Sequence, residues 1–419
     1  MTLVLSIVLI VLILLGAPLF SAIGASAMLG FSGEGTDLSI VAIEFYGLAE
    51  TPVLLAIPLF TFAGFLLSQG GAPARLVRLS EAALGWLSGG LAIVSLIACA
   101  LFTAFTGASG VTIIALGAVL FPALVASGYS ERFSLGLITT SGSLGLLFAP
   151  SLPLILYGIV ANVSIDDLFR AGIIPGTLMI VFLAVYSIWK NRHAATRKGT
   201  VSVAELKSAI FDARYELPLP LIVLGGIYSG FFAVSEAAAV TAVYVLVSEL
   251  LLRREIPIRD LPGVIRESML LVGAIFMILG LSLASTSYMI GIEMPQRLFE
   301  FVSPYIASEA GFLIVLLLFL LVVGAILDIF SAIVLVVPLI VPVALQYDVH
   351  PVHLGIVFLA AMELGYLTPP VGLNLFISSY RFNKDIAEVY SATLPFLLVL
   401  LVCVLLIAFL PQLSLFLLF

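Results

Sequence analysis

The stretch Thr103-Ala-Phe-Thr106-Gly-Ala-Ser109-Gly-Val-Thr112 places hydroxyl side chains and glycines in the middle of a long apolar segment. Residues 82–130 contain no charged side chain, yet basic residues flank this segment at Arg78 and Arg132. Basic residues beside membrane segments favour the cytoplasmic side, so the segment is expected to enter the membrane and return. Its first arm would form about 24 Å of helix, less than a hydrocarbon core of about 30 Å. The pattern predicts a re-entrant helical hairpin at about 90–127, with its tip buried in protein.

The composition of the whole chain indicates a lipid environment. Of 419 residues, 62% are hydrophobic and 10% are charged, a balance that would leave large apolar patches on a water-soluble protein. Uncharged runs such as residues 51–69 and 171–189 are long enough to cross a membrane as helices. Helices are expected because a lipid-exposed backbone must satisfy its own hydrogen bonds. The sequence therefore predicts an all-α polytopic membrane protein, in which Cys99 and Cys403 are buried packing residues.

The basic residues set the expected topology. Fifteen of the 17 Lys and Arg residues fall in five clusters, and the positive-inside rule places all five in the cytoplasm. Nine crossings satisfy these positions, with the N-terminus in the cytoplasm and the C-terminus in the periplasm. The clusters are residues 75–78, 132, 190–214, 253–266 and 381–384, and the crossings are at about 3–29, 51–69, 133–160, 171–189, 217–231, 233–252, 267–291, 352–380 and 389–410.

A second segment has the same character as the first. Residues 310–347 carry a single charged side chain, Asp328, close to their middle. On the expected topology this segment enters from the periplasmic side and returns to it. We therefore expect a second re-entrant hairpin at about 310–346.

Short motifs recur along the chain at a nearly constant spacing. Pro73-Ala-Arg75-Leu76 and Pro295-Gln-Arg297-Leu298 precede the hairpins and are 222 positions apart. Gly145 to Pro150 and Gly365 to Pro370 follow the hairpins and are 220 positions apart. A constant offset indicates duplication, and the odd number of crossings between the hairpins makes the halves inverted. The expected units are residues 1–190, a cytoplasmic linker at 191–216, and residues 217–419.

The glycine and proline motifs after the hairpins predict two discontinuous transmembrane helices, at about 133–160 and 352–380. A break within such a helix frees backbone carbonyls and exposes helix ends, which can hold an ion or a charged solute. Inverted repeats with interrupted helices are typical of secondary transporters that bind their solute near the midplane. The plainer interpretation is that these residues only kink packed helices. The paired set favours transport.

The chain resembles the large membrane subunit of the tripartite ATP-independent periplasmic (TRAP) transporters over nearly its whole length. The stretches that carry the resemblance are Ala56-Ile-Pro-Leu-Phe60 with Gly64, Thr106 to Thr112 with Pro122 and Gly128-Tyr129, Ala171-Gly-Ile-Ile-Pro-Gly176, Ser235-Glu-Ala-Ala-Ala239, and Thr368-Pro-Pro-Val-Gly372-Leu-Asn374-Leu-Phe376. The resemblance implies the ion transporter superfamily, an elevator mechanism, the bacterial inner membrane, and sodium as coupling ion with no other metal or cofactor.

The resemblance also implies partners and a substrate class. The partners would be a small four-helix membrane subunit and a periplasmic substrate-binding protein, within membrane lipid and without nucleic acid. The substrates would be organic acids of the dicarboxylate, keto acid or sialic acid class. The sequence departs from the family pattern at Ala108, Thr112 and Ala149, where serine, aspartate and proline are usual.

Site residues are carried over position by position from the resemblance. One sodium site would join the first hairpin to the first break, and a second would join the second hairpin to the second break, with the substrate between the two hairpin tips. The first sodium site would comprise Thr106, Gly107, Thr112, Gly145, Phe148 and Pro150, the second Gly324, Asp328, Gly365, Thr368 and Pro370, and the substrate site Ser109 and Pro369.

The sequence suggests a separate role for each of three acidic residues. A bare carboxylate at the midplane is costly, so Asp328 is expected to be a cation ligand or, second, a protonated structural acid. Glu363 lies at similar depth and is expected either to couple ion movement or to make a structural hydrogen bond. Glu236 is expected to cap a helix start. No chemistry is assigned to His193, His350 or His353, which lie in or beside predicted loops.

Two other classes of protein fit part of the sequence. Gly107-Ala-Ser109-Gly110 matches the signature of intramembrane serine proteases, but that chemistry needs a histidine base beside the serine, and no histidine lies deep in a predicted span. The other class is a stand-alone symporter of divalent anions and sodium that works without a periplasmic receptor.

Overall fold

The computed structural model describes residues 8, 9, 11, 16–84, 89–192 and 202–418, and within these ranges its regular structure is entirely helical. The elements are α2 (Leu19–Gly33), α3 (Ser39–Gly47), η1 (Leu48–Glu50), η2 (Pro52–Leu55), α4 (Ala56–Gln69), α5 (Ala72–Leu84), α6 (Gly90–Thr106), α7 (Ser109–Ala126), α8 (Glu131–Ser141), η3 (Leu144–Leu147), α9 (Leu152–Ala161), α10 (Ile165–Lys190), α11 (Val203–Asp212), α12 (Pro218–Tyr228), α13 (Val234–Val247), η4 (Ser248–Leu252), α14 (Leu261–Gly291), α15 (Met294–Val302), α16 (Glu309–Ile326), α17 (Ile329–Gln346), α18 (Pro351–Gly365), α19 (Leu373–Phe382), α20 (Ile386–Phe409) and α21 (Gln412–Leu415).

The helices confirm an all-α polytopic membrane protein. In the described ranges, eight helices are long and apolar enough to cross a membrane, and a ninth candidate is the pair 131–147 and 152–161, bent by 44°. The arms α7, α16 and α17 are among the eight, so helix length alone does not distinguish a re-entrant arm from a crossing. The first predicted crossing, 3–29, falls partly outside the described residues, and its described helix is α2. The turn between α12 and α13 occurs at the expected Phe231 and Phe232.

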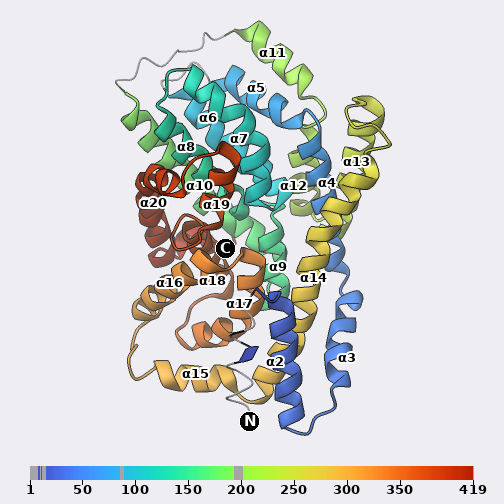
Figure 1. Ribbon diagram of the computed structural model, residues 1–419, viewed down its shortest axis with the longest axis vertical. Coiled ribbons are helices and arrows are strands. Elements are labelled where there is room, and N and C mark those ends of the chain that lie inside the picture. The colour runs from blue at the N-terminus through green and yellow to red at the C-terminus, as the bar shows by residue number, and fades with distance from the viewer. Residues whose placement is uncertain (1–7, 10, 12–15, 85–88, 193–201, 419) are drawn as a thin grey trace.

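Two bodies of helices lie side by side. The helices α2, α3, α4, α12, α13 and α14 pack with one another, and α14 runs along the length of this body (Figure 1). The second body contains the two predicted hairpins, α6 with α7 and α16 with α17, together with α8 to α10 and α18 to α20. Figure 1 shows α5, α6 and α11 toward one end of the molecule and α15 and α16 toward the other.

In the second body, helices from the N-terminal half of the chain pack on helices from the C-terminal half. Helix α7 packs on α19, which follows the second break, and α17 packs on α9, which follows the first break. In the same way α8 packs on α20, and α18 packs on α10. This exchange is the arrangement that the predicted inverted duplication requires. The duplication, its unit boundaries and its cytoplasmic linker, of which residues 193–201 lie outside the described residues, stay predictions.

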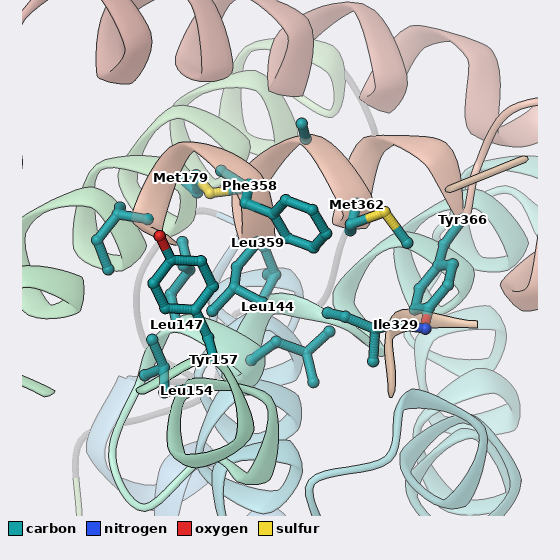
Figure 2. Close-up of a cluster of buried hydrophobic side chains, with 14 of the residues drawn as sticks. Leu144, Leu147, Leu154, Tyr157, Met179, Ile329, Phe358, Leu359, Met362 and Tyr366 are labelled. Atoms are coloured by element: carbon teal, nitrogen blue, oxygen red, sulfur yellow. The ribbon is translucent and has the colours of Figure 1, made fainter. Parts of the chain in front are cut away.

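The junction between the parts is apolar and fully buried. Figure 2 shows Leu144 and Leu147 of η3 and Tyr157 of α9 facing Phe358 and Leu359 of α18. The Tyr157 hydroxyl donates a hydrogen bond of 2.8 Å to the carbonyl of Pro351. Burial of so much apolar surface holds the two broken regions against each other.

An ion-pair cluster joins two of the basic sequence clusters at one end of the protein. Arg75 of α5 pairs with Glu216 at 2.6 Å and also with Glu255, and Arg253 reaches Glu216 at 3.4 Å. Burial alone would raise the pKa of Glu255, but hydrogen bonds from Arg75 and the Gly71 N–H outweigh burial and lower it. The basic clusters at 75–78 and 253–266 therefore share one end, as the positive-inside argument expects, while the orientation of that end stays a prediction.

The packing of α8 on α20 depends on a glycine. A Cβ atom at Gly136 would lie 2.2 Å from the Ala392 carbonyl oxygen and 2.7 Å from the Phe396 ring. We predict that Gly136→Ala lowers the free energy of unfolding by about 1–3 kcal/mol, the usual effect of overpacking, measured by thermal unfolding of the purified protein in detergent. Gly225→Ala in α12 is the control, because no atom lies within 4 Å of its Cβ position. Equal stability of the two variants would contradict the packing described.

Candidate functional site

The tip of the first hairpin is a two-residue connection. Helix α6 ends at Thr106, and Gly107 turns the chain with a φ of 65°, in the left-handed region that favours glycine. The Gly107 N–H donates to the Thr103 carbonyl at 2.7 Å. A Cβ atom at Gly107 would lie 2.5 Å from the Leu152 side chain. Glycine is therefore required both by the turn and by the close approach of α9.

Thr103 links this tip to the first break. Its hydroxyl lies 2.8 Å from the Gly142 carbonyl oxygen and 2.6 Å from the Thr112 hydroxyl. A carbonyl can only accept, so the Thr103 proton is given to Gly142 and Thr112 donates to Thr103. The sequence did not single out Thr103 as a site residue, although its hydroxyl lies in the same stretch as Thr106 and Thr112.

The first break separates α8 from α9. Gly145 packs so closely on α6 that a Cβ atom there would lie 2.2 Å from the Ala100 carbonyl oxygen. The Phe148 ring covers Gly176, Pro150 is buried, and the Ala149–Pro150 peptide bond is cis. All six residues expected at the first sodium site lie at this tip or in this break, and Gly107 and Thr112 contact the region of the break directly or through Thr103.

Three hydroxyl groups at this site have no hydrogen-bond partner among the described residues. The Thr106, Thr140 and Ser151 hydroxyls are fully buried and unpaired. A buried polar group left unsatisfied costs about 1–3 kcal/mol, so their presence indicates a place for a ligand or water. Thr140 and Ser151 are not among the site residues expected from the sequence. The run of hydroxyl residues at 139–143 and the serine after Pro150 were the available signals.

Asp328 caps the second hairpin's returning helix. Its carboxylate accepts hydrogen bonds of 3.0 Å from the N–H groups of Phe330 and Ser331, and one from the Ser331 hydroxyl. The side chain is half-buried. The neighbouring Ile329 N–H donates to the Tyr366 hydroxyl at 2.7 Å, and Figure 2 shows the Tyr366 ring reaching Ile329 from α18. Asp328 is thus fixed at the tip and linked to the second break.

The second break is formed by backbone contacts. Gly324 and Gly365 approach so closely that a Cβ atom at Gly365 would lie 2.6 Å from the Gly324 Cα. The Ala325 carbonyl accepts from the N–H groups of Val371 and Gly372 at 3.2 and 3.1 Å.

The remaining residues of the expected second sodium site lie on the second break itself. The Thr368 hydroxyl donates to the Leu364 carbonyl at 2.9 Å. Pro370 is exposed, and the Pro369–Pro370 bond is cis. The structure therefore brings Gly324 against Gly365, and Thr368 and Pro370 follow within the same break.

The two expected substrate residues differ in exposure. Ser109 begins α7 and is 4% exposed, whereas Pro369 is exposed in the second break. Helix α7, which Ser109 begins, meets α19, which follows the break that contains Pro369, because Gly110 of α7 lies against Ile377 of α19. The α7 N-terminus has no side-chain cap, unlike the α17 N-terminus that Asp328 caps. Its free N–H groups are suited to an anion.

Glu363 is completely buried in α18. Neither carboxylate oxygen has a hydrogen-bond partner in the described part of the chain. One of the two expected roles of Glu363 was a structural hydrogen bond, and no described residue makes such a bond with its carboxylate. Glu236 behaves as expected, because its carboxylate accepts from the Ala233 N–H at 3.0 Å at the start of α13.

The histidines do not form a catalytic pair with Ser109. His353 lies in the first turn of α18, beside a loop as expected, and its side chain is buried. Its Nδ1 lies 2.6 Å from the Ser414 hydroxyl and its Nε2 lies 3.2 Å from the Ala408 carbonyl oxygen. Both ring nitrogens are thus engaged near the C-terminal helix. His350 caps the start of α18 through the Val352 N–H, and His193 lies outside the described residues.

The fold and the site define a polytopic helical membrane protein in which two hairpin tips face two broken helices. The family model of the tripartite ATP-independent periplasmic transporters, DctM component, matches residues 6–413, and the chain belongs to this family. The C4-dicarboxylate TRAP transporter large permease of Pseudomonas aeruginosa is 34% identical over 393 residues, which cover 94% of this chain and 92% of that protein.

Two further proteins extend this comparison. The ectoine/5-hydroxyectoine TRAP transporter large permease of Ruegeria pomeroyi is 31% identical over 412 residues, covering 97% of this chain and 96% of that protein. The crystal structure of the Alcanivorax borkumensis YdaH transporter matches with a TM-score of 0.59 at 16% identity, covering 88% of this chain and 86% of that chain. This last likeness shows the fold alone.

These relatives decide between classes of protein. They are permease subunits of transporters, which identifies the chain as a non-enzymatic transport protein and removes the protease reading. TRAP systems pair such a large permease with a periplasmic binding protein and a small membrane subunit. The chain is thus one membrane component of a multi-part transporter.

Thr103 offers a test of the link between tip and break. Replacing it by valine removes the acceptor for Thr112 and leaves the Gly142 carbonyl unpaired. We predict that Thr103→Val lowers the free energy of unfolding by about 1–3 kcal/mol, whereas Thr103→Ser, which keeps the hydroxyl, has less than half this effect. Thermal unfolding in detergent measures both variants.

The control for this test is Thr61→Val. The Thr61 hydroxyl is equally buried but bonds only the Ile57 carbonyl of its own helix. An equal loss of stability in Thr103→Val and Thr61→Val would show that the contact between tip and break contributes no more to the free energy of unfolding than a hydrogen bond within one helix.

Proposed function

We propose that this permease imports an organic acid of the dicarboxylate, keto acid or sialic acid class together with sodium, after a periplasmic binding protein delivers it. The observation that carries the proposal is the set of unpaired, buried hydroxyls of Thr106, Thr140 and Ser151 in a region without charged side chains. Neutral oxygen atoms gathered around a helix break form the kind of site that holds sodium in secondary transporters. The setting is the bacterial inner membrane, with the N-terminus in the cytoplasm and the C-terminus in the periplasm.

The first sodium ion would bind between the first tip and the first break. Thr106 and Thr112 would offer hydroxyl oxygens, and backbone carbonyls would come from Gly107, Gly145, Phe148 and Pro150. In support, the Thr106 oxygen has no protein partner, and Gly145 lies directly on α6. No carboxylate is available there, so the ion would be held by dipoles alone.

The second sodium ion would bind where Gly324 contacts Gly365, with oxygens from Asp328, Thr368 and the carbonyl next to Pro370. Asp328 is the single charge of its hairpin and sits at the tip. Its hydrogen bonds to Phe330 and Ser331 would orient the carboxylate without neutralising it fully. A cation beside it would complete that neutralisation.

The organic acid would lie between the tips, near Ser109 and Pro369. The uncapped N-terminus of α7 supports a carboxylate there, because its N–H groups and helix dipole favour negative charge. Of the two permeases described above, the Pseudomonas aeruginosa protein is named for C4-dicarboxylates and the Ruegeria pomeroyi protein for ectoine and 5-hydroxyectoine. A carboxylate group at this end of α7 is common to all three proposed classes of organic acid.

An elevator movement is part of the proposal. The hairpins and broken helices pack chiefly with one another, while α2 to α4 and α12 to α14 form a separate body. Such a division would allow the site-bearing body to slide as a unit past the other. The small membrane subunit would enlarge the static body.

Asp328 allows capping to be separated from ion binding. Asparagine caps helices about as well as aspartate but lacks the charge, so Asp328→Asn is expected to fold normally and to raise the sodium concentration for half-maximal uptake at least tenfold. Asp328→Ala is expected to lose sodium-driven uptake and about 0.5–2 kcal/mol of stability. The measurement is solute uptake into proteoliposomes that contain both membrane subunits, with the loaded binding protein outside.

The control is Asp348→Asn, at an exposed position with a φ of 59° that asparagine adopts readily. Unchanged sodium dependence in Asp328→Asn would remove Asp328 from the ion site and leave it as a cap. Uptake of the free acid with neither partner present would instead favour a stand-alone symporter.

A further inference from the structure

Asn374 connects the second break to the first. It is the second residue of α19, and it is completely buried. Its side-chain Nδ2 lies 3.2 Å from the Thr139 carbonyl oxygen and 3.3 Å from the Ser143 hydroxyl. Thr139 and Ser143 belong to the final turn of α8 and the start of the first break. One amide group thus bridges parts of the chain that are more than 200 residues apart.

The orientation of the amide follows from its partners. The Thr139 carbonyl can only accept, so the group that faces it must be the amino group of the side chain. Its second proton is available to the Ser143 hydroxyl. The Oδ1 atom then faces away and has no hydrogen-bond partner in the described ranges. The bridge therefore depends on Asn374 as a donor.

A second link lies one helical turn further along α19. The Ser378 hydroxyl is 2.8 Å from the Thr139 hydroxyl, which itself donates to the Leu135 carbonyl at 2.7 Å. The Thr139 proton is used there, so Ser378 donates to Thr139. Residues four apart share a helix face. Asn374 and Ser378 together join one face of α19 to α8.

The face of α19 that carries Asn374 and Ser378 connects the second break to α8. Helix α19 starts at the second break, where the backbone of residues 371 and 372 is bonded to Ala325 of the second hairpin. Any shift of that break on ion binding would move α19, and Asn374 would transmit the shift to the Thr139–Ser143 turn. With the offset of 220, position 374 corresponds to Leu154, which cannot hydrogen-bond. The first half therefore has no matching side-chain donor at the corresponding position.

We propose that Asn374 is a positioning residue that couples the two breaks, so that sodium bound at the second break strengthens sodium binding at the first. This inference rests on the proposed function. Coupling of this kind is reciprocal and typically changes affinity about 5- to 150-fold. Asn374 acts through Thr139 and Ser143 and need not touch an ion itself.

The test is the sodium dependence of uptake in proteoliposomes with the loaded binding protein. The wild-type protein is expected to show a Hill coefficient above one. In Asn374→Leu the coefficient falls toward one and half-saturation requires about 5- to 150-fold more sodium, while the KM for the loaded binding protein at saturating sodium stays unchanged. A residue that only stabilised the fold would lower the amount of active protein without changing the shape of the sodium curve.

The matched control is Ser379→Ala. Its hydroxyl is on the same helix but donates to the Lys384 carbonyl at 2.6 Å, away from α8, so the sodium curve is expected to keep its wild-type shape. Ser378→Ala removes only the second link and is expected to give an intermediate curve. It keeps the inference testable if Asn374→Leu fails to fold.

The outcomes separate this inference from the proposed function. Wild-type uptake that needs no sodium would overturn the proposed function. Sodium-dependent wild-type uptake whose Hill coefficient is already about one, or is unchanged in Asn374→Leu and Ser378→Ala, would overturn the coupling role of Asn374 and leave sodium-driven transport standing.

Discussion

A helix that is broken inside a membrane leaves backbone groups that only protein can satisfy, and the organisation of this permease follows from that constraint. At the first break the Gly142 carbonyl accepts from Thr103 of the hairpin. At the second, the Ala325 carbonyl of the hairpin accepts two N–H groups from beyond the break, and Tyr366 receives the Ile329 N–H of the hairpin tip. Each hairpin is therefore the hydrogen-bonding partner of the broken helix that follows it.

The two halves solve this problem with different chemistry. The second tip is charged and capped by its own Asp328, whereas the first tip is neutral, with Ala108 at the corresponding position 220 residues earlier. The first tip instead depends on hydroxyls, and Asn374 of the other half donates to Thr139 and Ser143 at the first break. In the proposed function, a neutral tip and a charged one would give the transported anion a preferred orientation, because the carboxylate of Asp328 would repel it and the uncapped end of α7 would attract it.

Much of the fold could be predicted because lipid makes charge positions informative. The absence of charge in residues 82–130, and Asp328 as the single charge of its segment, located both tips, and the glycine–proline motifs located both breaks. Residues whose role depends on packing could not be found in this way. Thr103, Thr140 and Ser151 are ordinary hydroxyl residues in sequence, and only folding shows which of them lacks a partner. The burial of His353 was likewise not predicted, because the contact of α18 with the C-terminal helix α21 leaves no periodic signal.

The exchange of partners between the halves also bears on how the chain is made. Helix α7 packs on α19, and α9 packs on α17. Because α17 and α19 belong to the second half, the first half enters the membrane before these two helices have been synthesised. The first hairpin, which carries hydroxyl groups and an uncapped helix end, reaches its final packing only after the last fifth of the protein, which contains α19, has been synthesised. A chain that ended before α19 would therefore leave α7 of the first hairpin without the helix on which it packs.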